Sequence, residues 1–174
     1  MPSLLSRLRR VRHSDQVIAT RVRETLVESL YASPQSLVIG AVASSAIALT
    51  VAIVSGDTLL IVGAIALTVT ACARMVDALR PAPALDDGVQ RSELQVKRQE
   101  LIYLAGALCY SMLLGVFGLL TLTNTGDGVL QLLAVTTTIG YAAGIAGRNA
   151  GRPWIALSQL CCASGPIIVG LLVS

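Results

Sequence analysis

Charged residues are scarce in this chain of 174 residues. Asp, Glu, Lys and Arg make up 13% of it and hydrophobic residues 54%, whereas a soluble domain carries charge on about a quarter of its residues. The mean hydropathy is +0.73. The composition therefore excludes an ordinary soluble domain and predicts an integral membrane protein.

Aromatic residues are also few, at 3% of the chain, with one Phe and one Trp. A membrane β-barrel needs interfacial girdles of aromatic residues and strictly alternating segments of about 10 residues. Here the apolar residues run continuously over lengths that suit a helix crossing a hydrocarbon core of about 30 Å. We therefore predict an all-α integral membrane protein, a five-span helical bundle with spans at about 34–54, 58–78, 101–122, 129–147 and 154–173.

Side chains that carry chemistry are nearly absent. The one histidine, His13, lies in a basic tail, and no carboxylate or histidine lies at mid-depth in a span, which disfavours an ion or proton pathway. Four cysteines lie in apolar spans without the spacing of metal ligands, so we expect small buried hydrophobic residues and no disulfide: Cys72, Cys109, Cys161 and Cys162. We predict no enzyme activity for this chain, no metal, no cofactor and no nucleic-acid partner.

The first 32 residues differ from the rest. Apolar residues such as Leu4, Leu8 and Val11 recur there at helical spacing, with arginines on the other faces. We predict that residues 1–32 form a basic amphipathic helix on the cytoplasmic membrane surface; a solvated tail is the alternative. The first apolar run, which opens the transmembrane domain of residues 33–174, begins too late to be a cleaved signal peptide.

Basic residues fix the expected orientation. All 13 lie before the first span, at the end of the second, before the third, or between the fourth and fifth, while the turns "SGDT" and "TNTGDG" carry only Asp57 and Asp127. By the positive-inside rule, the N-terminus and the basic loops are cytoplasmic. We expect a multi-pass membrane protein with its acidic turns outside.

The stretch "GIAGRNAGRP" at residues 144–153 invites two readings, a phosphate cradle or the cytoplasmic turn between two spans. Its glycine spacing fits neither the dinucleotide fingerprint nor the P-loop. We interpret Arg148 and Arg152 as cytoplasmic anchoring or coupling residues, since a basic residue near an anionic leaflet contributes about 1 kcal/mol. Pro153 suits the first turn of the next helix.

Small residues mark the fourth span as a packing helix. Gly140 with Gly144, and Gly147 with Gly151, form two G-x-x-x-G patterns, which let helix backbones approach closely in lipid. We expect the fourth span to be the central, most buried helix, and we expect Gly144→Leu to force its neighbours apart. The partners are lipid and other transmembrane helices, in a homo-oligomer or a larger complex.

Two charged residues, Arg74 and Asp77, fall inside a predicted span, near its cytoplasmic end. Charged residues in spans are functional candidates; we interpret this pair as anchoring, with sensing or coupling as the alternative. Hydroxyl groups of the third and fourth spans could line a small polar pocket, although Thr and Tyr in helical bundles more often bond to neighbouring helices: Tyr103, Tyr110, Thr136, Thr137, Thr138 and Tyr141.

Three stretches carry a resemblance to a known family. "LYASPQSLVIGA" at 30–41, "ELIYLAGAL" at 100–108 and above all "GYAAGIAGRNAGRPWIALSQL" at 140–160 resemble the N-terminal membrane region of alphaproteobacterial signalling proteins. Those proteins carry GGDEF, and often EAL, domains that make or degrade cyclic di-GMP. The resemblance implies a membrane sensory or anchoring domain.

Two departures qualify what the resemblance implies. This chain has no G-G-[DE]-[DE]-F or E-A-L motif, so the catalytic machinery lies outside it. Five spans place Ser174 outside, so a cytoplasmic catalytic domain implies a further span beyond that residue. The alternatives are a small accessory structural subunit of a larger membrane complex and, less favoured, part of a transporter.

Overall fold

A computed structural model describes residues 34–79, 93–149 and 153–173. They form five helices: α2 (Pro34–Ser55), α3 (Thr58–Leu79), α4 (Glu93–Asn124), α5 (Gly128–Arg148) and α6 (Pro153–Val173). All five are long and apolar enough to cross a membrane. The expectation of five apolar helices is confirmed, whereas the predicted basic helix at 1–32 lies outside the described residues.

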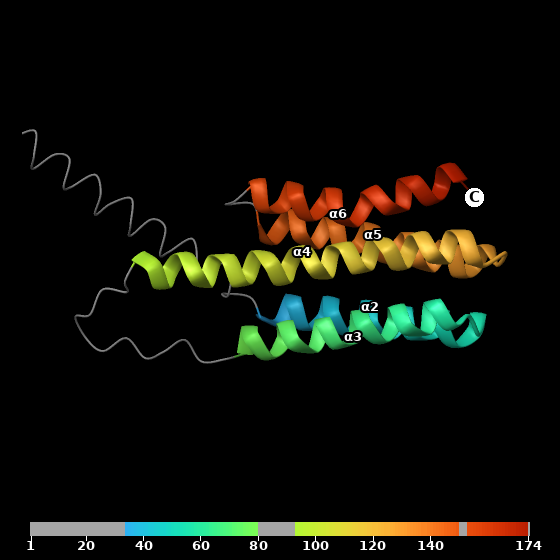
Figure 1. Ribbon diagram of the computed structural model, residues 1–174, viewed down its shortest axis with the longest axis horizontal. Coiled ribbons are helices and arrows are strands. Elements are labelled where there is room, and N and C mark those ends of the chain that lie inside the picture. Colours follow the sequence, from blue (N-terminus) through green and yellow to red (C-terminus); the bar gives the residue numbers. More distant parts are fainter. Residues whose placement is uncertain (1–33, 80–92, 150–152, 174) are drawn as a thin grey trace, which may run out of the picture.

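The helices run alternately in opposite directions as a long bundle (Figure 1). The hairpin of α2 and α3 packs on α4 and α5, and α4 packs most extensively on α6. Because α5 separates α4 from α6 in the chain, these two helices run parallel (Figure 1). α4 therefore contacts α3, α5 and α6 and occupies the centre of the bundle.

The expectation that the fourth span is the most buried is wrong. In the α4 span 44% of residues are buried, against 22% in the α5 span. The reason lies in glycines that were not singled out in the sequence: a Cβ placed on Gly115 would lie 2.6 Å from the carbonyl oxygen of Ala163. Backbones of α4 and α6 thus approach as closely as glycine permits.

Further along the same contact, glycines come from both helices. A Cβ on Gly118 of α4 would meet the side chain of Ile167, and one on Gly170 of α6 would lie 2.8 Å from Cδ1 of Leu122. These neighbours are side-chain ends that can move. Gly115 faces rigid backbone, so it is the tightest point of the contact between α4 and α6.

The glycines of α5 make no such contact with the other described residues. Gly140, Gly144 and Gly147 are exposed, and a Cβ on any of them would have no neighbour within 4 Å. A Cβ on Gly144 therefore meets no neighbouring helix among the described residues, and the expected effect of Gly144→Leu stays a prediction. Gly151 lies outside the described residues, and packing of this face on another chain stays a prediction.

Acidic caps organise one end of the bundle. Gly56, with φ of 67°, turns the chain between α2 and α3, and Asp57 Oδ1 accepts hydrogen bonds from the amides of Leu59 and Leu60 at 2.7 and 3.2 Å. Asn124 Nδ2 donates to Asp57 Oδ2 at 3.2 Å, tying the end of α4 to this turn. The bonds from the Leu60 and Leu59 amides and from Asn124 outweigh desolvation and lower the pKa of Asp57.

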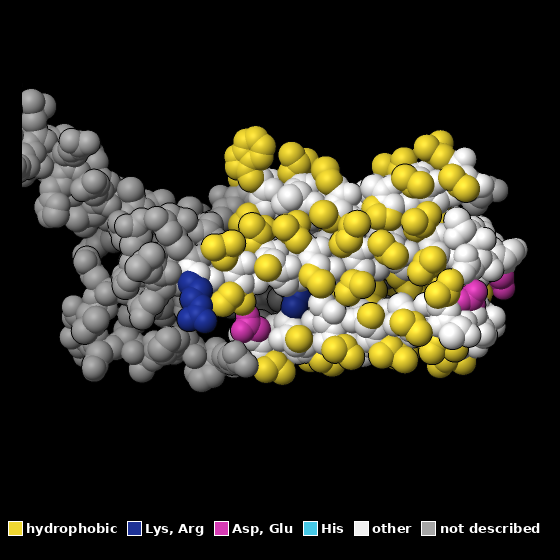
Figure 2. Space-filling model, in the orientation of Figure 1, with side chains coloured by type: hydrophobic (Ala, Val, Ile, Leu, Met, Phe, Trp, Pro, Cys, Tyr) yellow, Lys and Arg dark blue, Asp and Glu magenta, His cyan; other side chains and the backbone are white. Residues whose placement is uncertain are grey.

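The second acidic turn is built in the same way. Asp127 is the N-cap of α5 and accepts a hydrogen bond from the Val129 amide at 2.8 Å. Both acidic turns lie at one end of the bundle, and the described basic side chains lie in the opposite half (Figure 2). The charge separation expected from the sequence is present along the axis of the bundle.

The outer surface of the bundle is apolar along its length (Figure 2). Large exposed side chains include Ile39, Ile53, Leu132 and Leu172. Three cysteines expected to be buried also lie on this surface, since Cys72, Cys109 and Cys161 are exposed and Cys162 is half-buried; all four are free thiols. Such a surface is compatible with contact to a lipid bilayer.

Candidate functional site: a pocket between four helices

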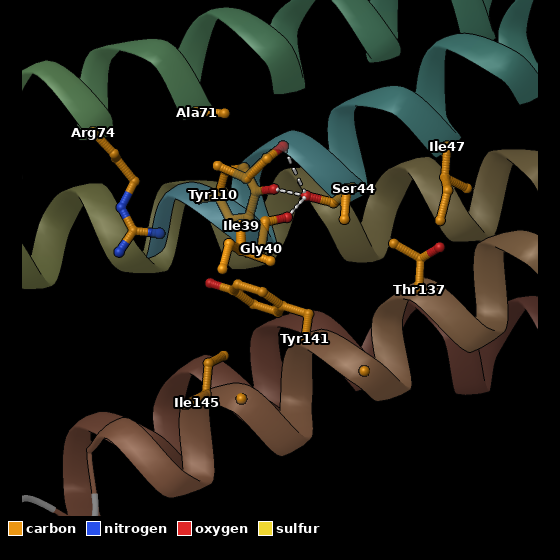
Figure 3. A pocket seen from close by; sticks show the side chains of 14 residues that line it. Ile39, Gly40, Ser44, Ile47, Ala71, Arg74, Tyr110, Thr137, Tyr141 and Ile145 are labelled. Carbon is orange, nitrogen blue, oxygen red and sulfur yellow. Dashed lines mark hydrogen bonds between the residues drawn. The ribbon is translucent and has the colours of Figure 1, made fainter. Parts of the chain in front are cut away.

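A pocket of about 320 Å³ lies where α2, α3, α4 and α5 meet (Figure 3). This volume is at the lower end of the range of roughly 300–1,000 Å³ that is usual for small-molecule sites. The lining is mostly apolar, with few polar groups: Ile39, Gly40, Ala41, Ala43, Ser44, Ile47, Ala71, Arg74, Tyr110, Thr137, Gly140, Tyr141, Gly144 and Ile145.

Small residues create the space. Gly40 and Ala43 on α2 and Gly140 and Gly144 on α5 line the pocket, and all four are exposed. Where two helices meet through residues without large side chains, no side chain fills the gap between them. The pocket therefore reaches the outer surface of the bundle between α2 and α5.

Arg74 supplies the positive charge of the pocket. It reaches from α3 toward α4, where its guanidinium carbon lies 5.4 Å from the ring centre of Tyr110 and 6.0 Å from that of Tyr103. Cations at such distances are attracted to the electron-rich ring face. Its Nη2 is buried and has no hydrogen-bond partner among the described residues.

Two tyrosines, Tyr110 from α4 and Tyr141 from α5, lie next to each other in the pocket (Figure 3). The rings of Tyr110 and Tyr141 lie 5.3 Å apart and are tilted by 58°. Tyr110 shares a hydrogen bond with Ser44, and Tyr141 shares one of 2.9 Å with Ser111. These bonds join α4 to α2 and to α5, and so hold the walls of the pocket together.

The polar residues around Arg74 extend, through a further hydrogen bond, to the end of α5. Tyr103 donates a hydrogen bond of 3.4 Å to Oδ1 of Asn149, a residue that is 1% exposed. Nδ2 of Asn149 has no partner among the described residues. Arg74 is therefore linked through one tyrosine to α2 and through the other to the turn after α5.

The residues expected from the sequence are only partly brought together. Arg74 lines the pocket, while Asp77 lies one turn further along α3 and makes an interaction of its own. Arg148 is the last residue of α5, and Arg152 lies outside the described residues. Arg74 is thus the one member of this predicted group that the pocket includes.

The hydroxyl residues divide into two groups. Tyr110, Thr137 and Tyr141 line the pocket, so half of the six predicted hydroxyls meet there. Thr138 instead donates to the carbonyl of Ala134 within its own helix, and Thr136 is exposed. Three of the predicted hydroxyl residues thus meet at a pocket, but the lining of that pocket is mostly apolar rather than polar.

Buried polar residues on α2 and α6 were missed. Ser44 is 3% exposed and Gln159 is 0% exposed, and both polar atoms of Gln159 lack a partner among the described residues. A signal was present: Gln159 is an amide in an otherwise apolar span, where an unpaired polar group costs free energy.

The site offers the guanidinium of Arg74, hydroxyl groups on three of its helices and an apolar cavity. The described part of the chain holds no group of three His, Cys, Asp or Glu residues that could bind a metal. Comparison with family models, curated proteins and solved structures found no match.

Proposed function

We propose that this chain is the membrane-embedded sensory and anchoring domain of a bacterial cyclic di-GMP signalling protein. In this proposal it crosses the inner membrane five times, with the N-terminus and the basic end in the cytoplasm. The positive-inside rule supports that orientation, and the sequence resemblance at residues 140–160 supports the signalling class.

The observation that carries the sensory role is the pocket around Arg74. A purely structural anchor has no need of a cavity, and an arginine near the end of a span can extend its side chain to the membrane interface instead of turning into the bundle. Here such an arginine lies against Tyr103 and Tyr110, both on the central helix α4. A ligand in the pocket would thus act directly on that helix.

The length of α4 offers a route for the signal. α4 begins at Glu93, whereas its apolar span begins at Leu101, so eight residues precede the span. At 1.5 Å per residue this segment is about 12 Å long. In the proposed orientation it projects into the cytoplasm, where a catalytic domain would receive a displacement of α4.

The reading frame beyond codon 174 tests the signalling class. A sixth span followed by a GGDEF or EAL motif would support the proposal, because a cytoplasmic catalytic domain needs one more crossing. A stop codon directly after Ser174 would refute it.

In that case the second candidate, a small accessory subunit of a larger membrane complex, would stand. One observation favours that candidate: Gly140, Gly144 and Gly147 form an exposed glycine face on α5 that packs on no other helix in the described part of the chain. Copurification of a stoichiometric membrane partner would support it.

A further inference from the structure

We infer that the pocket binds a single-chain amphiphile whose headgroup is a carboxylate or a phosphate. The inference deepens the proposed function, on whose membrane location it rests, because the hydrocarbon tail of the ligand is expected to enter from the bilayer. The headgroup would pair with Arg74 and the tail would lie between α2 and α5.

The charge of the headgroup follows from Arg74. A buried guanidinium nitrogen that lacks a hydrogen-bond acceptor is costly, and an anion that reaches it gains a charge-assisted bond. Nη2 of Arg74 is in that state among the described residues; because Arg74 lines the pocket, a rotation of its side chain would bring this buried nitrogen to an anion bound there. Asp77, the acidic residue one turn along α3, does not satisfy this nitrogen.

The other polar groups of the pocket are consistent with a ligand that has a single anionic headgroup. The hydroxyls of Tyr110 and Ser44 are already bonded to each other, and Tyr141 is bonded to Ser111. Each hydroxyl of such a pair can still offer a lone pair or a proton to a ligand. A volume of about 320 Å³ leaves room for a headgroup and a first stretch of chain, but little for a two-chain glycerolipid.

The direction of entry follows from the small residues. Gly40, Ala43, Gly140 and Gly144 line the pocket and are exposed, so the opening lies on the apolar outer surface rather than at a polar end of the bundle. Ile39 and Ile47 flank the same side of α2. A hydrocarbon tail that leaves the pocket between α2 and α5 would pass mostly apolar side chains, and the hydroxyl of Thr137 on this side is already bonded to the carbonyl of Leu133.

Binding is measured on the purified 174-residue chain in a non-ionic detergent, by the ligand-dependent shift of the thermal unfolding midpoint. The probes are dodecanoate and dodecyl phosphate, with dodecanol as the uncharged control of equal length and inorganic phosphate as the control without a tail. We expect one or both anionic amphiphiles to raise the midpoint, and whichever does so identifies the headgroup.

Variants locate the site. Arg74→Gln should weaken binding at least tenfold, and Arg74→Lys, which keeps the charge, should retain part of it. Gly144→Leu narrows the opening, whereas Gly147→Leu is a matched control on the same helix that is equally exposed but does not line the pocket. Only the first of these two should weaken binding.

Several results would overturn the inference. Equal shifts with dodecanol and dodecanoate would remove the role of charge, and a shift with inorganic phosphate alone would remove the role of the tail. If Gly144→Leu and Gly147→Leu weaken binding equally, the ligand binds elsewhere. If no probe shifts the unfolding midpoint, the pocket does not bind an anionic amphiphile. A stop codon after residue 174 refutes only the signalling class, so the two failures are distinguishable.

Discussion

Gly115→Ala tests the packing of the bundle most sharply, because the new Cβ would meet backbone on the facing helix. It would lie 2.6 Å from the carbonyl oxygen of Ala163 and 2.7 Å from that of Cys162. A relaxed contact between carbon and oxygen is roughly 3.3–3.6 Å. α6 must therefore retreat by about 0.7 Å, and a helix cannot do so at one residue alone.

The expected cost combines two opposing effects. Overpacking in a well-packed core costs about 1–3 kcal/mol, while replacing glycine by alanine inside a helix gains up to about 1 kcal/mol. We expect a net loss of about 1–2 kcal/mol. Gly144→Ala is the matched control, since its Cβ has no neighbour within 4 Å among the described residues. This variant should keep the stabilisation from replacing glycine in a helix without the cost of overpacking.

The measurement is the free energy of unfolding, obtained by titrating the detergent-solubilised protein with sodium dodecyl sulfate and following helicity. We expect the two variants to shift stability in opposite directions. If Gly115→Ala is as stable as the parent, or if both variants shift equally, then α4 and α6 do not approach each other as described.

Three further predictions concern topology, acid stability and catalysis. Cysteines placed at Asp57 and Asp127, in a background without the native four, should react with an impermeant reagent from outside intact cells while one at Gln90 does not; the reverse pattern would invert the orientation. Hydrogen bonds lower the pKa of Asp57 below 3.8 in the folded protein. The Asp57 carboxylate therefore stabilises the start of α3 above that pH, and this stabilisation is lost as the pH falls through the lowered pKa of the folded state. Asp57→Asn, a cap without a titrating group, should lessen the loss of thermal stability below pH about 3.8, and an unchanged acid profile would count against this role. The purified chain should neither bind nor turn over GTP, which filter binding and phosphate release would check, and measurable turnover would contradict the reading of its glycines.

The sequence could predict the helices because their signal is local. Continuous apolar runs, Pro34 and Pro153 at the first helical positions and the acidic turns all act within a few residues. Which faces meet is a different matter, since lipid is as apolar as a leucine surface and small residues drive packing only where a partner exists. The G-x-x-x-G patterns of α5 favoured packing through that helix, but the close backbone contact forms at Gly115, because α6 packs against α4.

The candidate site was predictable in its residue types but not in its assembly. Arg74 was identifiable as a charged residue in a span, and Tyr110, Thr137 and Tyr141 as hydroxyls. Their meeting depends on the α2–α3 hairpin packing against α4 and α5, a tertiary choice that no local pattern encodes. Ser44 was missed because a serine in an apolar helix commonly bonds its own backbone, as this one also does with the carbonyl of Gly40.

The parallel pairing of α4 and α6 has a consequence for biosynthesis. The tightest contact of the bundle joins Gly115 to Ala163, which are 48 residues apart in the chain, with all of α5 between them. Contacts between distant segments form late, after the intervening chain has been made and the loop has closed. Until α6 has been synthesised, the glycine groove of α4 stays open on a nascent chain, and this interval is when a foreign helix or a chaperone has its best access to the centre of the bundle.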